Sequence, residues 1–373
     1  MSFSKISVSV NQFLRTLATR AMRCFPASTK LSKTDLRNEK IARILLARPN
    51  FRLGNSILAI PSIHLFRKNF PEARIDFVGG PASEPVLAGQ PINKHFRIER
   101  RFPLSLWSYP LLLRKLRSEN YDLAVEVSCS QSALGAFVVG LSGARLKIGR
   151  RGKWDFWYNV KVAKTREINK YRVLPEFVSA LGLNAEEVFP KISLSSHEIE
   201  DGRGLIRSAV GENRPIVGVF IGGRNRQGKR WPLKNFARLI RRLLSRGFPV
   251  VVFVGPEERK FMDTNLLPAV PVIFDLPMRR FAAALAQCSL FVSCDSGPMH
   301  LACALGIRTI AIFLKKNFNR WGPPAERARI VFDPNGVSVD AVEAACVAEW
   351  SRLMSRPEFV TTVKSHTISA STA

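Results

Sequence analysis

Short apolar runs alternate with longer segments of helical period along most of this chain. The runs have the length of strands buried on both faces of a parallel sheet, and the longer segments have the period of helices that cover such a sheet. We expect strands at Ala42–Ala47, Arg74–Val78, Asp122–Val127, Leu146–Gly149, Ile216–Phe220, Val250–Val254, Val272–Phe274, Leu290–Ser293 and Thr309–Phe313. We expect helices at Asn55–Asn69, Leu106–Ser118, Ser130–Leu141, Lys234–Arg246, Glu258–Leu266, Arg279–Gln287, Met299–Leu305 and, last, about Asp340–Met354.

Strands separated by helices predict right-handed βαβ units and therefore an α/β fold with parallel sheets. A chain of 373 residues exceeds one ordinary core, so we expect two Rossmann-like domains, with the last helix packing back across both. The predicted parts are an N-terminal arm (1–40), a first domain (41–190), a linker (191–214), a second domain (215–340), a C-terminal helix (341–357) and a disordered tail (358–373).

Residues 295–302 mark a point where a buried strand turns directly into a helix. Pro298 predicts the first helical position, so Ser296 and Gly297 would offer free N–H groups at the positive end of the helix dipole, which favours an anion. Asp295 ends the strand, where open α/β sheets bind their ligands. An ordinary capped turn would have the same residues, so this segment alone does not establish a site.

A second loop, residues 222–232, also follows an apolar strand and precedes a helix. Its glycines let the backbone approach a ligand closely, and four cationic side chains can reach phosphate oxygens. A solvated basic loop is the ordinary alternative, but Trp231 and Pro232 at the end of the loop indicate a held shape. Two anion-suited loops in one half of the chain predict a nucleotide-diphosphate ligand.

Sequence motifs extend this pattern over both halves of the chain, from roughly Ile41 to Pro323. They are Leu53-Gly54-Asn55-Ser56-Ile57-Leu58-Ala59-Ile60-Pro61, Phe70-Pro71-Glu72-Ala73-Arg74-Ile75-Asp76, Arg224 with Gly228-Lys229-Arg230-Trp231-Pro232, Val254-Gly255-Pro256-Glu257, and Asp295-Ser296-Gly297-Pro298-Met299-His300-Leu301-Ala302. In this order they resemble the signatures of glycosyltransferase family 9, the ADP-heptose:lipopolysaccharide heptosyltransferases.

The resemblance implies a GT-B arrangement, in which an acceptor domain (41–190) and a nucleotide-sugar-binding domain (215–340) face a central cleft. It implies inverting transfer of a sugar, heptose from ADP-heptose, to a phosphorylated lipopolysaccharide core or a related glycolipid. We expect no cofactor and no metal ion, since no paired carboxylates of the DxD type follow a strand in the cleft. The implied donor-binding residues are Arg224 and Lys229 at the diphosphate, the amides of Ser296 and Gly297 at its oxygens, Asp295 at the sugar, Glu257 at the ribose, Leu276 or Met278 near the adenine, and His300 near the phosphates or in a purely structural role.

The general base is where this chain departs from the family. The family has Leu-Gly-Asp after the first strand, and the resemblance assigns that aspartate as the base, but this chain has Asn55 there. A carboxamide does not accept a proton near pH 7, whereas a positioned base contributes about 10²- to 10⁴-fold. Three outcomes are open: Glu126 replaces the base, water accepts the proton in a slower enzyme, or transfer is lost and binding kept. We favour a working transferase, because the donor-side residues are complete.

The formal net charge of +28 predicts an anionic partner. No nucleic-acid reading module occurs, so we expect an anionic membrane surface and a phosphorylated glycolipid in preference to nucleic acid; binding to nucleic acid by charge alone is a weaker alternative. The six cysteines have no metal-ligand or paired spacing, which is typical of buried thiols in a reducing cytosol. No apolar run approaches about 18 residues, so we expect a cytoplasmic protein at the inner face of a bacterial inner membrane.

Residues 1–40 are basic, with no acidic residue before Asp35. Between Val10 and Cys24, helical spacing places apolar residues on one face and arginines on the others, as in an interfacial amphipathic helix. An organellar transit peptide and a plain disordered tail fit the same composition. For the whole chain, the alternatives to a heptosyltransferase are a related transferase with another nucleotide sugar and a catalytically silent nucleotide-sugar-binding protein.

Overall fold

A computed structural model describes residues 36–99, 104–128, 130, 132–211, 215–223, 228–259 and 264–355. The predictions for most of the N-terminal arm and for the C-terminal tail lie outside these residues, as does the prediction for Arg224. The described cysteines, Cys288, Cys294, Cys303 and Cys346, are free and buried, as the sequence predicts.

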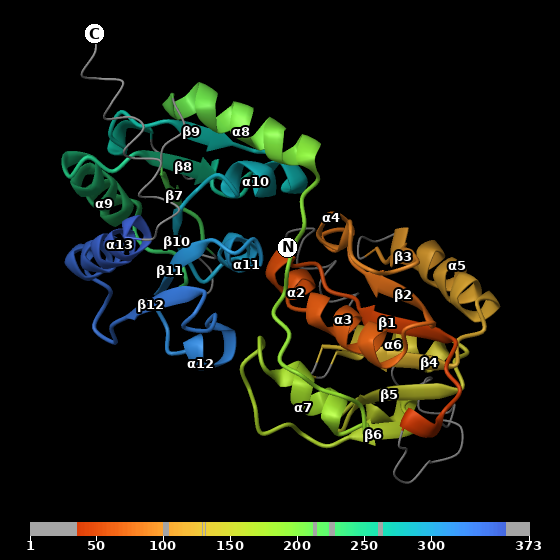
Figure 1. Ribbon diagram of the computed structural model, residues 1–373. Helices are drawn as coiled ribbons and strands as arrows, with labels where there is room; N and C mark the ends of the chain where they lie inside the picture. The colour runs from red at the N-terminus through yellow and green to blue at the C-terminus, as the bar shows by residue number, and fades with distance from the viewer. Residues whose placement is uncertain are drawn as a thin grey trace, which may run out of the picture.

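Two six-stranded parallel sheets form the framework, one in each half of the chain (Figure 1). The first has the order β3-β2-β1-β4-β5-β6 and the second β12-β11-β10-β7-β8-β9. The first-sheet strands are β1 (Arg43–Arg48), β2 (Arg74–Gly79), β3 (Lys94–Arg97), β4 (Leu123–Glu126), β5 (Leu146–Arg150) and β6 (Val160–Val162). The second-sheet strands are β7 (Val217–Phe220), β8 (Val250–Val254), β9 (Val272–Phe274), β10 (Leu290–Cys294), β11 (Arg308–Phe313) and β12 (Ala328–Phe332). The predicted α/β fold with two parallel sheets is confirmed.

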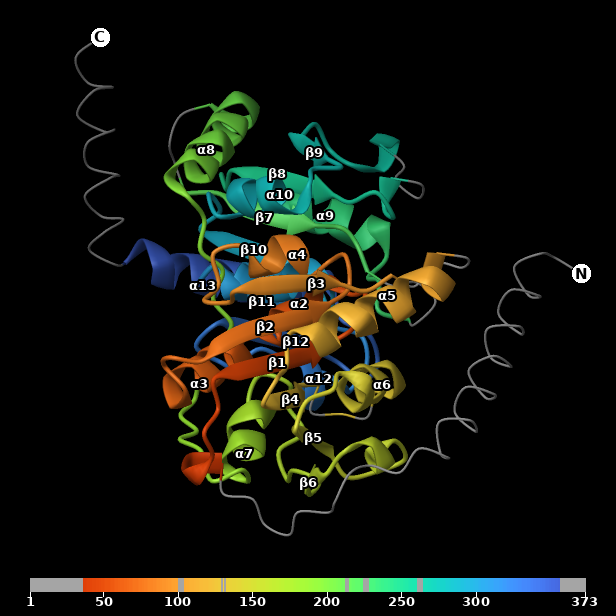
Figure 2. The ribbon, with the colours of Figure 1, turned by 90° about the vertical axis from the view of Figure 1, so that its right-hand side faces the viewer.

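Helices cover both faces of each sheet, which explains why the central strands are mostly apolar. In the first half these are α2 (Leu53–Ile57), α3 (Ile60–Asn69), α4 (Glu84–Leu87), α5 (Leu104–Ser118), α6 (Ala133–Leu141) and α7 (Val173–Ser179). In the second half they are α8 (Ser196–Val210), α9 (Leu233–Ser245), α10 (Met278–Leu285), α11 (Gly297–Ala304), α12 (Phe318–Trp321) and α13 (Val339–Met354). Figure 2 shows the first sheet with α3 on one face and α5 and α6 on the other, and these faces belong to two separate apolar cores.

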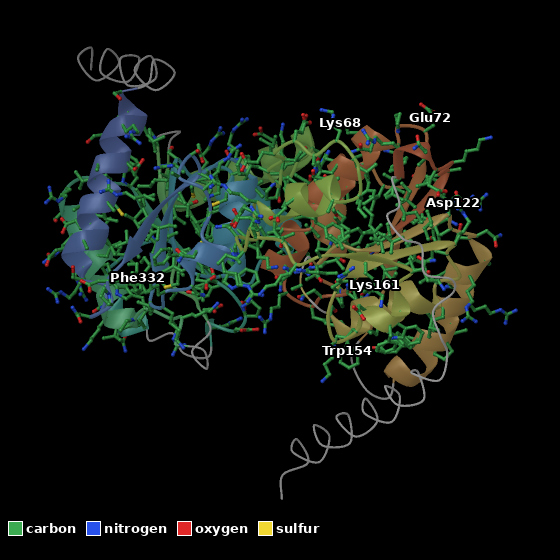
Figure 3. All side chains as sticks on the ribbon, turned by 90° about the horizontal axis from the view of Figure 1, so that it is seen from below. Lys68, Glu72, Asp122, Trp154, Lys161 and Phe332 are labelled. Carbon is green, nitrogen blue, oxygen red and sulfur yellow. The ribbon has the colours of Figure 1, made fainter. Side chains whose placement is uncertain are left out.

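The carboxyl ends of the first-sheet strands point toward the second half. Figure 3 shows Asp122, the residue before β4, on the side of the first half that faces away from the second. The two halves meet where α2 contacts α11. Both helices begin directly after a central strand, so this contact lies at the carboxyl ends of both sheets (Figure 1).

The structure corrects three predicted helices. The segment expected as one helix at Asn55–Asn69 is two helices, because Pro61 cannot donate the backbone hydrogen bond that would continue α2 into α3. The described part of Glu258–Leu266 is a turn followed by a short 3₁₀ helix, Thr264–Leu266. The last helix, α13, does not cross both domains: it packs on α9, β10, β11 and β12 of its own half.

The predicted linker contains a regular helix, α8. Ser195 and Glu198 form a capping box at its N-terminus, in which each side chain accepts a hydrogen bond from the other residue's backbone N–H. Gly202 of this helix has a packing role, because a Cβ there would lie 2.3 Å from the carbonyl oxygen of Ala283 in α10. In the described residues, no helix is long and apolar enough to cross a membrane.

Candidate active site

A cavity of about 940 Å³ opens where the carboxyl ends of the two sheets face each other. The first half contributes residues 51–55 and the second half contributes the loops that follow β7, β8, β9, β10 and β11. Nine predicted site residues line it: Asn55, Lys229, Glu257, Leu276, Met278, Asp295, Ser296, Gly297 and His300. Glu126 does not line this cavity.

The two anion-suited loops, which follow β7 and β10, lie side by side because of the strand order. The order of the second sheet reverses between β7 and β10, and open α/β sheets bind ligands at such a switch point. Lys229 follows β7 and Asp295 follows β10, and Lys229 Nζ lies 2.6 Å from Asp295 Oδ2. The amide of Asn317, in the loop after β11, donates to the same oxygen at 2.8 Å. Asp295 is therefore fixed by two partners while it lines the cavity.

The loop that carries Lys229 is anchored by the tryptophan at its end. Trp231 is 1% exposed, its Nε1 donates to the carbonyl of Val337 at 2.9 Å, and its ring meets Phe236 edge-on at 5.0 Å. The held shape predicted from Trp231 and Pro232 is thus present in the described part of the loop.

The helix that follows Asp295, α11, begins at Gly297, so Pro298 is its second residue and not the first helical position that the sequence predicted. Ser296 is the N-cap of α11, its hydroxyl accepts from the backbone N–H of Met299 at 3.4 Å, and Pro298 occupies the first turn. Gly297 faces the first half so closely that a Cβ there would lie 3.1 Å from Leu53. The N-terminus of α11 therefore opens into the cavity between the halves, where its free N–H groups and dipole favour an anion.

Two adjacent carboxylates, Glu257 and Glu258, lie at the other end of the cavity. Glu257 is exposed, whereas Glu258 is half-buried and accepts a backbone hydrogen bond from Gly223. Burial, followed by the charge of Glu257, raises the pKa of Glu258. Leu276 and Met278 line the same end, and the residue before them, Asp275, has a φ of +46°.

Asn55 is buried at 8% exposure in α2, close to the cavity. Arg48, at the end of β1, donates to Asn55 Oδ1 at 3.3 Å, and Asn55 Nδ2 donates to Asn50 Oδ1 at 3.2 Å. Both ends of the carboxamide are therefore engaged, and the positive charge of Arg48 lies where a carboxylate at position 55 would be stabilised.

Glu126 lies at the end of β4, beside β1, but faces the interior of the first half. It is 1% exposed, and its Cγ lies 2.6 Å from the position that a Cβ on Gly135 of α6 would take. Burial raises the pKa of Glu126 to about 7, against the opposing effects of Ser128 and Arg48. That pKa suits a base, but in this conformation the carboxylate does not reach the cavity.

His300, in the first turns of α11, is 4% exposed and also lines the cavity. Burial lowers its pKa to about 4, so the imidazole is neutral near pH 7. Its Nδ1 lies 2.6 Å from the hydroxyl of Tyr171, a buried residue of the first half. Its Cδ2 lies 2.5 Å from where a Cβ on Gly54 would be, so position 54 has no room for a side chain.

The family model for glycosyltransferase family 9 (heptosyltransferase) matches residues 111–349 of the chain. The chain belongs to glycosyltransferase family 9. Lipopolysaccharide heptosyltransferase 3 of Escherichia coli is 25% identical over 291 residues, which cover 72% of this chain and 83% of the relative.

Solved structures of this family share the fold. The glycosyl transferase family 9 protein of Veillonella parvula superposes with a TM-score of 0.74 at 19% identity, covering 85% of this chain and 99% of that one. An E. coli heptosyltransferase with ADP-2-deoxy-2-fluoro heptose superposes with a TM-score of 0.66 at 18% identity, covering 82% and 99%. The GT-B arrangement expected from the resemblance is therefore confirmed, and the protein is a glycosyltransferase.

Several cavity residues of this family 9 enzyme were not predicted from the sequence. Glu258 lines the cavity beside the predicted Glu257 but lies outside the sequence motif, which ends at Glu257. The segment after β11, which includes α12, contributes Lys315, Asn317 and Trp321 to the cavity lining. Its position at the carboxyl end of a predicted strand was the available signal.

Proposed function

We propose that the chain is an inverting transferase that moves heptose from ADP-heptose to a lipopolysaccharide core or a related phosphorylated glycolipid. The observation that carries this proposal is the cavity at the switch point of the second sheet, where Lys229, Asp295 and the N-terminus of α11 meet. The E. coli relative, a lipopolysaccharide heptosyltransferase, supports the choice of sugar and acceptor.

In this proposal the second domain (215–340) binds the donor. Lys229, with Arg224, neutralises the departing diphosphate, and the amides of Ser296 and Gly297 bind its oxygens. Asp295 contacts the donor sugar, Glu257 and its neighbour Glu258 lie at the ribose, and Leu276 and Met278 border the adenine. Preorganised charge at a leaving group is commonly the largest catalytic contribution, about 3 kcal/mol for a single donor.

The first domain (41–190) receives the acceptor, whose hydroxyl must approach along residues 51–55. Asn55 cannot accept its proton, and Glu126 does not reach the cavity. We therefore propose that water takes the proton and that stabilisation of the leaving diphosphate drives transfer, which predicts a slow enzyme.

The acceptor is anchored in a membrane, and the net charge of +28 supports a peripheral position at the inner face of the bacterial inner membrane. Flotation with vesicles tests this part: binding should require anionic lipid and weaken with added salt. Equal binding to zwitterionic vesicles would contradict it.

Release of ADP from ADP-heptose, with and without heptose-deficient lipopolysaccharide, tests the proposed reaction. We expect release to depend on the acceptor and to fall when the acceptor has been dephosphorylated.

The environment of Asn55, whose amide is held at both ends, favours a second candidate: a related transferase with another nucleotide sugar, or a catalytically weak nucleotide-sugar-binding protein. A panel of nucleotide sugars separates these, because the weak binder would bind ADP-heptose without releasing ADP.

A further inference from the structure

Residues 169–171 of the first half reach across to the second half by three hydrogen bonds. The backbone N–H of Lys170 donates to the carbonyl of Arg320 at 2.8 Å, and Asn169 Nδ2 donates to the carbonyl of Gly322 at 3.0 Å. These two carbonyls flank Trp321, which lines the cavity. The third contact joins the Tyr171 hydroxyl to His300 Nδ1 at 2.6 Å.

The length of the contact between Tyr171 and His300 indicates which group donates. Hydrogen bonds with an N–H donor to oxygen are usually 2.7 to 3.2 Å long, whereas those with an O–H donor extend down to about 2.5 Å. At 2.6 Å the contact fits a phenol that donates to Nδ1, and burial keeps that phenol protonated by raising the pKa of Tyr171 well above its ordinary value. A neutral imidazole carries one proton, so that proton is then on Nε2.

The surroundings of the pair leave few competing partners. Tyr171 is 3% exposed and His300 is 4% exposed, so water does not readily replace their bond. Cys303 is a second hydrogen-bond partner of the Tyr171 hydroxyl, but its S–H donates to Thr309 Oγ1 at 3.7 Å and its sulfur is a weaker acceptor than an imidazole nitrogen. The charged groups that influence His300 are Asp295 and Lys229.

We infer that Tyr171 is a positioning residue for the nucleotide-sugar site: it holds His300 as the neutral Nε2–H tautomer, so that the ring offers an N–H to an anionic diphosphate oxygen. This inference rests on the proposed function. The ring packs against Gly54, with Nε2 3.3 Å from where a Cβ on that residue would be, and it lines the cavity beside Lys229. Lys229 supplies the charge and His300 an oriented neutral donor.

The link between the halves gives Tyr171 a second effect. Its hydroxyl comes from the first domain, whereas His300 and Lys229 belong to the second. The donor N–H is therefore fixed only while the two halves are in contact. Removal of the hydroxyl leaves Nδ1 without its partner and allows the imidazole to change tautomer or rotate.

Nitrogen-15 NMR of the full chain labelled at histidine tests the tautomer directly, and the sequence has only five histidines to assign. His300→Gln identifies the resonance of His300. We expect the wild-type ring to carry its proton on Nε2 and to keep it there when ADP is added. We expect Tyr171→Phe to shift or broaden the His300 signals, whereas Tyr158→Phe, the same change at another buried tyrosine of the first half, leaves them unchanged.

Calorimetry with ADP gives the second readout. Loss of one hydrogen bond predicts roughly three- to tenfold weaker binding for Tyr171→Phe. In the His300→Gln background the same change should have no further effect, because the residue that it positions is gone. A purely structural tyrosine would weaken both backgrounds equally.

Protonation of wild-type His300 at Nδ1 would overturn the inference, as would ADP binding by Tyr171→Phe equal to that of Tyr158→Phe. Failure of the proposed function appears differently: the wild type would then bind no ADP while His300 still showed the Nε2–H tautomer.

Discussion

The pair of Lys229 and Asp295 gives the sharpest prediction for the donor site. Lys229→Ala removes a cation that lines the proposed diphosphate site. It also leaves Asp295, whose side chain is 7% exposed, with Asn317 as its remaining partner among the interactions described above. A hydrogen bond to a charged group contributes about 1.5 to 3 kcal/mol, so ADP should bind roughly 10- to 100-fold more weakly.

Stability gives an independent measure of the same pair. Breaking a buried ion pair from one side costs about 3 to 5 kcal/mol. The Lys229 side chain is 20% exposed and so partly screened, and we therefore expect a smaller loss, about 2 to 3 kcal/mol, in denaturant unfolding. The double variant Lys229→Ala/Asp295→Asn should regain most of this loss in stability but none of the affinity, because it removes the unpaired charge without restoring the cation.

The matched control is Lys234→Ala, which removes the same charge from an exposed position on α9. Isothermal titration with ADP and the ADP-release assay are run on both variants. If Lys229→Ala bound ADP as tightly as Lys234→Ala, the assignment of this cavity to a diphosphate would be refuted.

Four further predictions concern Asn55, Glu126 and Trp231. Asn55→Asp should fold normally and raise turnover, by up to about 10²-fold, because Arg48 would stabilise the new carboxylate; complete loss of transfer would mean that Asn55 has a role of its own. Glu126→Gln should retain transfer in the ADP-release assay, because Glu126 lies outside the cavity lining, and abolished transfer would instead identify it as the base. The pKa of Glu126 is raised to about 7, so the unfolded state releases this proton at a lower pH than the folded state. The wild type should therefore lose about 2 to 3 kcal/mol of stability as pH rises from about 4.5 to 7. Unfolding measured at pH 5 and pH 8 should show this loss, and the loss should be smaller in Glu126→Gln. Trp231→Ala should lower the free energy of unfolding by about 3 to 5 kcal/mol, while Trp231→Phe, which keeps a buried aromatic ring, should cost clearly less; equal losses would show that packing of the ring does not anchor the loop.

Much of the site was predictable because its signals are local. Pro298, Ser296 and the residues around Lys229 specify turns and a helix start from their own chemistry, and the parallel strand pattern places both loops at one sheet edge. The sequence therefore predicted residues that the structure brings together in one cavity. Most strand positions in both halves were predicted for the same reason, since buried parallel strands are apolar throughout.

The remaining features depend on tertiary contacts. Strands β3 and β6 are only a few residues long and have mixed polarity, so pairing with a neighbour defines them rather than their own pattern. Glu126 has the expected position along its strand, but the space over Gly135 decides that its side chain turns inward. Tyr171 lies in an irregular segment, and nothing local indicates that its hydroxyl meets a histidine 129 positions later.

Helix α8 determines where the C-terminal half can be separated from the rest. Its Gly202 packs against the main chain of α10. Helix α8 therefore covers α10 of the second half, although it precedes the first strand of the second sheet. A fragment that starts at residue 215 would lack this cover and leave the apolar side of α10 open to solvent. A fragment that starts at Ser195 keeps the capping box and the cover together, and is the natural starting point for obtaining the C-terminal half alone.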